Sequence, residues 1–311
     1  MSDEYAIEVN NITKTFGDKN AVDHVSLTVK KGEVFGLLGP NGAGKTTTLR
    51  MITTLLKPTS GSIKIFGHDT QKEDRLVRSM FGLTGQYASV DEDISARENL
   101  MIFSRLNGLS RSAAKKRTNE LLAEFSLEES ADKAISNFSG GMRRRLDLAV
   151  SLITQPALIF LDEPTTGLDP RTRNQMWDTI RDLVAKGSTI VLTTQYLEEA
   201  DELADTIAVI DHGKLISMGT PKELKAAVGG STLQVEIADP SNVAQAQDLI
   251  KTTLQTEVKL KNQELMAKLE NPNQVTAVLT ALSAEHIDIT NISVQQPSMD
   301  DVFFALTVGK N

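Results

Sequence analysis

A glycine-rich segment near the start of the chain has the residue types and spacing that hold a phosphate group. It fits the pattern G-x-x-x-x-G-K-[ST], in which the glycines let successive backbone N–H groups turn toward an anion. Lys45 adds positive charge for the β- and γ-phosphates, and the Thr46 hydroxyl is placed to hold Mg²⁺. An apolar run precedes the segment and a helical run follows it, which favours a nucleotide site over a chance turn. The expected nucleotide contacts are Gly39, Pro40, Asn41, Gly42, Ala43, Gly44, Lys45, Thr46 and Thr47.

Two adjacent carboxylates, Asp162 and Glu163, end a second apolar run at residues 157–162. We expect Asp162 to hold Mg²⁺ from the second shell of ligands. Glu163 would then lie beside the γ-phosphate, where a carboxylate can polarise a water molecule. An acidic turn after a core strand is common, so the functional interpretation depends on the phosphate loop upstream.

A third segment, Ser139, Gly140 and Gly141, opens a predicted helix and could bind another anion. The alternative is a serine that only caps the helix, which is the commoner case. A second phosphate-type site in one chain makes sense if it serves the nucleotide of another subunit. The basic run at residues 143–145 could meet phosphate or an acidic helix, or could be a solvated helix start.

Composition excludes several other kinds of site. The chain has 311 residues, 33 Lys and Arg against 41 Asp and Glu, and a formal charge of −8, which argues against a dedicated nucleic-acid binder. It has no cysteine, and its 4 histidines are scattered, so thiolate metal sites and a zinc cluster are not expected. The sequence has no apolar run that could span a bilayer and no apolar stretch at its acidic start. We therefore expect a cytoplasmic protein that could bind a membrane protein from that side.

The chemistry-bearing segments follow short apolar runs that alternate with helical patterns, which predicts a parallel sheet covered by helices. Alternating residues in the first 30 positions and at 62–66 predict a small antiparallel sheet on one flank. Residues 95–150 are mostly helical in pattern and read as an inserted helical subdomain, bounded at about 88–150. The expected core strands are 33–39, 157–162 and 188–194, and the expected helices are 45–56 and 171–186.

The pattern changes near residue 230, where Gly229 and Gly230 end a short helix. Strand and helix patterns then follow in the order β-α-β-β-α-β, which is typical of a ferredoxin-like α+β unit. A last helix at 300–306 closes the chain. We therefore expect two domains, at residues 1–230 and 231–311.

Together the motifs of the first domain resemble those of an ABC-type ATPase. The phosphate loop, Gln86 of a Q-loop, the signature at 139–141, the Walker B pair Asp162 and Glu163, and the D-loop at 167–169 occur in the family's order. The stretches FSGGMRRRLDLA, LDEPTTGLDPRTR, TTQYLEEAD and SMDDVFFALT resemble the daunorubicin/doxorubicin-resistance class of exporter ATPases along the whole chain. The resemblance implies a P-loop NTPase fold with a RecA-like core sheet, and ATP and Mg²⁺ as cofactors.

The same resemblance implies a homodimer that sandwiches ATP between one subunit's phosphate loop and the other's signature. It also implies a separate integral-membrane permease docked near the Q-loop and helical subdomain, and a peripheral location on the cytoplasmic face of the cell membrane. Phe16 matches the aromatic that stacks on adenine, Gln86 matches the residue that reaches Mg²⁺, and Asp169 belongs to the D-loop of the ATP site. No nucleic-acid partner is expected.

The chain departs from the family pattern at two places. Phe138 and Met142 replace the ends of the usual L-S-G-G-Q signature, and Gln195 stands at the switch position that is usually histidine. A glutamine amide can donate a hydrogen bond but cannot carry a charge or shuttle a proton. Glu163 must then act as base without imidazole help, and the expected catalytic residues are Glu163, Gln195 and Lys45.

The function expected from the sequence is ATP hydrolysis that energises an exporter of drugs or other amphipathic compounds. One alternative is a soluble ABC-type ATPase acting on DNA or ribosomes. The short interval between Lys45 and Ser139, the single cassette and the acidic charge disfavour it. A nucleotide-dependent regulatory module is the other alternative, and the glutamine at the switch position keeps it open.

Overall fold

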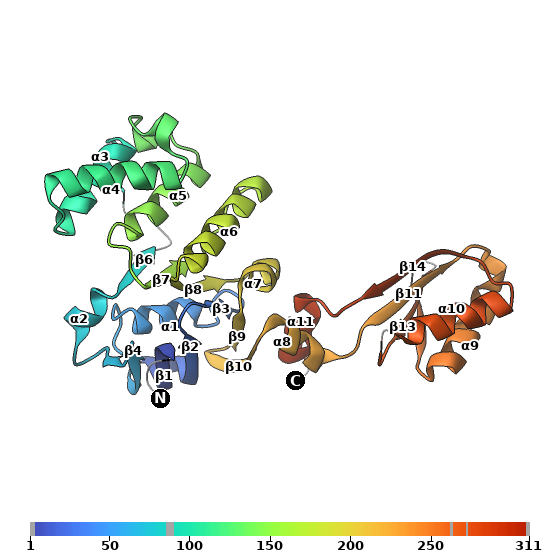
Figure 1. Cartoon of the computed structure of the whole chain (residues 1–311). Helices are drawn as coiled ribbons and strands as arrows, with labels where there is room; N and C mark the ends of the chain where they lie inside the picture. Colours follow the sequence, from blue (N-terminus) through green and yellow to red (C-terminus); the bar gives the residue numbers. More distant parts are fainter. Residues whose placement is uncertain (1–3, 85–89, 262–263, 272, 309–311) are drawn as a thin grey trace. The chain divides into compact units, whose positions relative to one another are not determined.

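The computed structural model describes residues 4–84, 90–261, 264–271 and 273–308 (Figure 1). The chain divides into two compact units, Met1–Pro221 and Lys222–Asn311. The division falls after Pro221, the first residue of the short helix α8 (Pro221–Val228), whereas the sequence pattern suggested a break after that helix. Among the described residues, the first unit encloses two clusters of buried apolar side chains and the second unit encloses one.

The central sheet of the first unit has the strand order β10-β9-β3-β8-β7-β6. Its strands are parallel except β10, which forms a hairpin with β9. Every residue of β3, β7 and β8 is buried, as expected for parallel strands covered on both faces. The strands are β3 (Val34–Leu38), β6 (Phe81–Thr84), β7 (Leu158–Asp162), β8 (Thr189–Thr194), β9 (Thr206–Asp211) and β10 (Lys214–Gly219).

Strand β8 lies between β3 and β7, and this order brings the phosphate loop after β3 near the acidic residues at the end of β7. Leu38 at the end of β3 pairs with Thr194, and Asp162 at the end of β7 pairs with Thr193. The carboxyl ends of the three strands therefore meet at one edge of the sheet, where open α/β sheets bind ligands.

An antiparallel sheet with the order β2-β1-β4-β5 flanks this core. Its alternating apolar residues pack in one cluster with helix α1 (Lys45–Ile52) and with Phe35 and Leu37 of β3. The predicted parallel sheet with an antiparallel flank is confirmed. The flanking strands are β1 (Tyr5–Phe16), β2 (Lys19–Lys30), β4 (Ser60–Ile65) and β5 (His68–Asp69).

Three helices of the first unit begin at serine residues that cap them. Ser95 and Glu98 form a capping box at α3, and the hydroxyls of Ser110 and Ser139 cap α4 and α5. Helix α1 ends earlier than the expected residue 56, because Thr54 has a left-handed φ of 61°. The helices are α1 (Lys45–Ile52), α2 (Asp74–Arg78), α3 (Ala96–Leu106), α4 (Arg111–Glu124), α5 (Gly140–Ser151), α6 (Pro170–Ala185) and α7 (Leu197–Leu203), with 3₁₀ turns at Glu128–Ser130 and Ile135–Asn137.

The second unit has an antiparallel sheet in the order β12-β13-β11-β14. Numbered within the unit, this is 2-3-1-4, the arrangement that a β-α-β-β-α-β chain produces, and the ferredoxin-like prediction is confirmed. Its elements are α8 (Pro221–Val228), β11 (Thr232–Ile237), a 3₁₀ turn (Pro240–Asn242), α9 (Val243–Leu254), β12 (Val258–Lys261), β13 (Glu264–Lys268), α10 (Gln274–Ala284), β14 (Ile289–Gln295) and α11 (Met299–Val308). Across the parts of the chain that the structure describes, no helix is long and apolar enough to cross a membrane.

The separate cores predict separate stabilities for the two units. Leu233 on β11 is fully buried, and Leu233→Ala should cost about 2–5 kcal/mol, as for other buried leucines. The loss should lower hydrogen-exchange protection in β11, β13 and β14 and leave β3, β7 and β8 unchanged. Leu260→Ala is the control because Leu260 is 52% exposed. An equal loss of protection in both units would show that they unfold together.

Candidate nucleotide-binding site

The loop between β3 and α1 surrounds a hollow of about 190 Å³ at the carboxyl edge of the sheet. A Cβ on Gly39 would lie 2.1 Å from the Ile210 carbonyl oxygen, and one on Gly44 would lie 2.6 Å from that of Ala21. Larger residues at these two positions would push the loop away from strands β9 and β2. The hollow is lined by Ala21, Asn41, Gly42, Gly44, Lys45, Thr46, Thr47 and Glu163.

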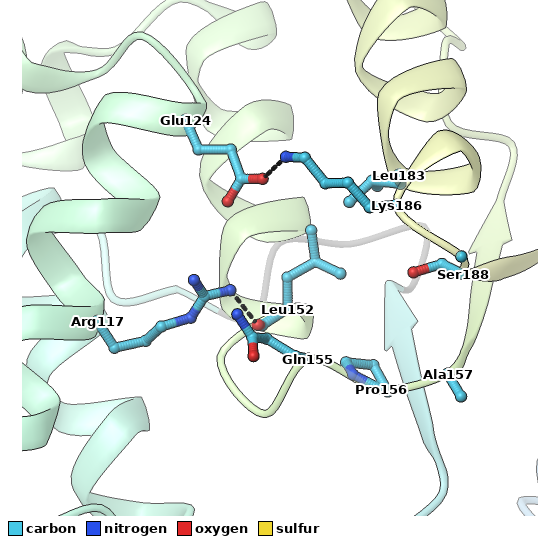
Figure 2. Close-up of a pocket in the computed structure, with 10 residues that line it drawn as sticks. Arg117, Glu124, Leu152, Gln155, Pro156, Ala157, Leu183, Lys186 and Ser188 are labelled. Carbon is cyan, nitrogen blue, oxygen red and sulfur yellow. Dashed lines mark hydrogen bonds and ion pairs between the residues drawn. The ribbon is translucent and has the colours of Figure 1, made fainter.

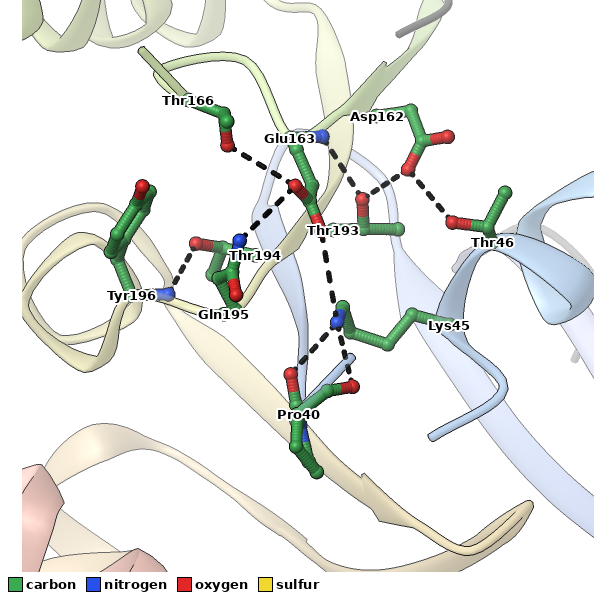
Figure 3. Close-up of polar contacts among 11 residues, drawn as sticks. Pro40, Lys45, Thr46, Asp162, Glu163, Thr166, Thr193, Thr194, Gln195 and Tyr196 are labelled. Carbon is green, nitrogen blue, oxygen red and sulfur yellow. Dashed lines mark hydrogen bonds and ion pairs between the residues drawn. The ribbon is translucent and has the colours of Figure 1, made fainter. Parts of the chain in front are cut away.

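Lys45 is the buried cation of this hollow, with 4% of the residue exposed. Its ammonium donates hydrogen bonds to the carbonyl oxygens of Gly39 (2.8 Å) and Pro40 (3.1 Å), and it lies 3.8 Å from Glu163 Oε1 (Figure 3). Burial lowers the pKa of Lys45, while the carboxylates of Glu163 and Asp162 act in the opposite direction. Two of its three N–H donors bond the backbone, so one is left for a phosphate oxygen.

Asp162 lies at the end of β7, opposite the phosphate loop. Its Oδ1 accepts a hydrogen bond from Thr193 Oγ1 (2.5 Å) and lies 3.4 Å from Thr46 Oγ1 (Figure 3). A carboxylate and a hydroxyl beside a phosphate site fit Mg²⁺, which usually takes one or two carboxylates together with substrate phosphates. The described residues contain no group of three or more His, Cys, Asp or Glu that could hold a metal without a substrate.

Glu163 has an unusual backbone conformation. Its φ is 48°, a left-handed value that costs a non-glycine residue of order 1–3 kcal/mol. Its N–H donates a hydrogen bond to the Thr193 hydroxyl (3.0 Å). Its carboxylate oxygen Oε2 accepts hydrogen bonds from Thr166 Oγ1 (3.1 Å) and Gln195 Nε2 (3.4 Å). Strain of this kind concentrates at functional sites. The Gln195 amide contacts the Glu163 carboxylate, which it was expected to assist.

The signature and D-loop residues do not line this hollow. Ser139 and Gly140 are exposed, and Ser139 Oγ accepts a hydrogen bond from Met142 N at 3.2 Å. Asp169 is also exposed and caps α6 through Thr172, whose hydroxyl is the main cause that lowers the Asp169 pKa. A Cβ on Gly141 would lie 2.3 Å from Thr172 Cγ2, so α5 and α6 approach closely here.

Two other predicted ATP-site residues lie outside the hollow or outside the described structure. Phe16 ends β1, is 53% exposed, and has the Lys14 ammonium 5.3 Å from its ring centroid. The strand that pairs with β1 brings Ala21 to the hollow. Gln86 lies outside the described residues.

Two charged residues to which the sequence analysis gave no individual role contact the chain around Glu163. Glu199 on α7 has 1% of its surface exposed and accepts from Thr165 Oγ1 (2.7 Å) and Trp177 Nε1 (3.4 Å). Burial raises the pKa of its carboxyl. Arg144 on α5 donates to the backbone on both sides of Glu163. No sequence pattern separates Arg144 from its basic neighbours.

A larger cavity, of about 390 Å³, lies at the opposite ends of the same strands (Figure 2). Its cations already have partners within the chain, since Arg117 donates to the Leu152 carbonyl and Lys186 pairs with Glu124. It shares no lining residue with the phosphate hollow and is a separate cavity. It is lined by Arg117, Glu124, Leu152, Gln155, Pro156, Ala157, Leu183, Lys186, Gly187 and Ser188.

Known proteins share this arrangement. Residues 22–166 match a family model described as ABC transporter, and residues 219–307 match one described as ATP-binding protein DrrA1-3-like, C-terminal domain. The daunorubicin/doxorubicin resistance ATP-binding protein DrrA of Streptomyces peucetius is 47% identical, over 97% of this chain and 92% of that protein. The chain belongs to the ATP-binding subunits of ABC transporters.

Other relatives agree with this assignment. The Nod factor export ATP-binding protein I of Sinorhizobium fredii is 38% identical, over 98% of this chain and 86% of that protein. A dimeric ATP-binding cassette bound to ADP and Pi is 28% identical, with a TM-score of 0.63 over 69% of this chain and 98% of that one. This ABC subunit is an ATPase that energises an exporter.

The buried Glu199 predicts a pH-dependent stability. Its folded-state pKa is raised above the ordinary 4.5, so the folded state loses stability as pH rises above that value and the carboxyl must ionise while buried. Glu199→Gln removes this ionisation. The Tm of the variant, relative to the unsubstituted protein, should therefore increase with pH in a series from about pH 5 to about pH 8.

Glu202→Gln on the same helix is the matched control, because the Glu202 side chain is 56% exposed and pairs with Arg181 at the surface. Its effect on Tm should be small at every pH, as for other exposed ion pairs. A Tm difference for Glu199→Gln that stays constant with pH would contradict burial of an ionisable carboxyl at this position.

Proposed function

We propose that two copies of this chain bind MgATP at shared sites and that hydrolysis drives a separate membrane permease. The phosphate loop and Lys45 would hold the β- and γ-phosphates. Thr46 and Asp162, with Gln86, would hold Mg²⁺, which neutralises charge on the phosphate oxygens when bound. The fixed Thr193–Asp162 contact supports this assignment, because it keeps one carboxylate facing the Thr46 hydroxyl.

Glu163 is the general base of the proposed reaction. Its carboxylate lies 3.8 Å from the Lys45 ammonium, which is the observation that carries the proposal. A γ-phosphate held by Lys45 would lie next to the carboxylate, within reach of a bridging water. Gln195 would orient that carboxylate or the water through its amide, since it cannot take a proton itself.

The exposed signature residues support a dimer. Ser139 and Gly140 present a capped helix start to solvent, and Asp169 is exposed at the start of α6. A second copy would bring these groups to the ATP held by the first, where the helix end favours negative charge. Phe16, also exposed, would stack on adenine.

The helical part of the first unit has an apolar face suited to a permease. Ile102 and Leu106 on α3 are 49% and 75% exposed, beside Met101 and the cationic Arg105. We assign this face to the permease on the cytoplasmic side of the membrane. Relatives named for daunorubicin and doxorubicin resistance support drugs or other amphipathic compounds as the exported class. The net charge of −8 supports the absence of a nucleic-acid partner.

Glu163→Gln tests the catalytic assignment. The amide cannot accept a proton from water, so the rate of ATP hydrolysis should fall about 10²–10⁴-fold. ATP binding should persist, and the variant should accumulate as an ATP-bound dimer in size-exclusion chromatography with light scattering. Asp178→Asn on the exposed side of α6 is the control and should behave as the unsubstituted protein. A fully active Glu163→Gln protein would refute the assignment of Glu163 as the general base.

Leu106→Glu tests the permease face. A charge at this exposed position should leave basal ATP hydrolysis intact and reduce the stimulation by the co-encoded permease in lipid at least about tenfold. Leu76→Glu on α2 is the control, since Leu76 is 44% exposed on another helix. Full stimulation of the Leu106 variant would assign permease contact to a different surface.

A further inference from the structure

Arg144 contacts the backbone on both sides of the proposed catalytic base. Its Nη2 donates to the Asp162 carbonyl oxygen at 2.8 Å, and its Nε donates to the Pro164 carbonyl oxygen at 3.0 Å. These carbonyls belong to the residues immediately before and after Glu163. Arg144 itself lies on α5, the helix that starts at the signature residues.

The first of these contacts acts on a peptide group that is held from two directions. Arg144 binds the carbonyl of the Asp162–Glu163 peptide, and Thr193 of β8 faces the N–H of the same peptide at 3.0 Å. The orientation of this peptide sets the φ of Glu163, which is 48°. A left-handed non-glycine residue persists only where its surroundings hold it. Arg144 supplies one side of that support.

The charge and shape of Arg144 suit this position. Burial lowers the pKa of its guanidinium, and the carboxylates of Asp147, Asp162, Glu199 and Glu163 oppose that shift. Arginine stays protonated in proteins, and its planar fork can bond two acceptors at once. A lysine ammonium is a point charge on a flexible stem and does not reproduce this geometry.

The neighbouring arginines of the same helix turn do not reach this loop. Arg143 pairs with Glu92 at 2.8 Å, and Arg145 donates to the Phe125 carbonyl at 3.0 Å. Contact with the backbone around Glu163 is therefore a property of position 144 and not of the basic run as a whole. Arg143 supplies a matched control of the same residue type.

We propose that Arg144 is a positioning residue that ties the signature helix to the peptide of the catalytic base. This role of Arg144 rests on the proposed role of Glu163. It goes beyond that role because the geometry of the base then depends on α5. The start of α5 is the part of this chain that the proposed dimer brings to the partner's ATP. A shift of that helix would therefore reach Glu163 through the guanidinium of Arg144. Arg144 does not line the phosphate hollow, so it acts on turnover and not on binding.

Steady-state kinetics of the full chain with its permease in lipid test this inference. Arg144→Lys and Arg144→Gln should each lower kcat at least about tenfold and leave the KM for ATP within about twofold. Arg143→Lys and Arg143→Gln should stay close to the unsubstituted protein in both constants. A rise in KM that matches the fall in kcat, or a normal kcat in both Arg144 variants, would overturn the inference.

A double variant distinguishes positioning from general weakening of the fold. Because Arg144 acts through Glu163, Glu163→Gln with Arg144→Lys should hydrolyse ATP in single turnovers as slowly as Glu163→Gln alone. A further loss on that background would overturn the inference. Tm and ATP binding are measured for each variant. If Arg144→Lys does not fold, Arg144→Gln carries the same test, and failure of both to fold would assign Arg144 to stability instead. An active Glu163→Gln protein would refute the proposed base itself.

Discussion

One hydroxyl group organises the carboxylate end of the nucleotide site. Thr193 is fully buried in β8, donates a hydrogen bond to Asp162 Oδ1, and faces the N–H of Glu163. These contacts depend on the pairing of β8 with β7, and β3 lies on the other side of β8, so the carboxyl ends of the three strands reach the same edge. The phosphate loop, the two acids and Gln195 all depend on that strand order. A buried hydroxyl with both a donor and an acceptor partner satisfies its polar atoms and fixes both acidic residues at once.

The parts of the fold and site that the sequence predicts are those encoded within short segments. The strand before the phosphate loop, the apolar run that ends in Asp162 and the serine caps each combine a local pattern with a local structure. Strand β6 was not predicted, since only its place beside β7 makes it part of the sheet. The roles of Thr193, Arg144 and Glu199 were not predicted either, because they come from contacts between residues 18 to 34 positions apart in the sequence. The basic run at 143–145 left three interpretations open, and tertiary contacts give each arginine a different partner.

Burial explains why the two departures from the usual signature are compatible with an anion site. Phe138 is 6% exposed and Met142 packs against the same apolar cluster, so both residues serve the core of the first unit. The groups that would meet a phosphate are the Ser139 hydroxyl and the N–H groups that follow it, and these are set by the helix cap. The helix cap is therefore unchanged when Phe138 and Met142 stand in place of the usual leucine and glutamine.

The arrangement of charges around Glu163 also limits how the site can work. A carboxylate placed beside a phosphate is repelled by it, so a catalytic base needs contacts that hold it in place when the nucleotide arrives. Here Oε2 is held by Thr166 and Gln195, and Oε1 faces the Lys45 ammonium. A glutamine at the switch position adds a neutral donor to this set, whereas a histidine would add a charge that varies near neutral pH. The polar contacts of Glu163 therefore hold its carboxylate in one orientation, and contacts from β8 and α5 hold its backbone.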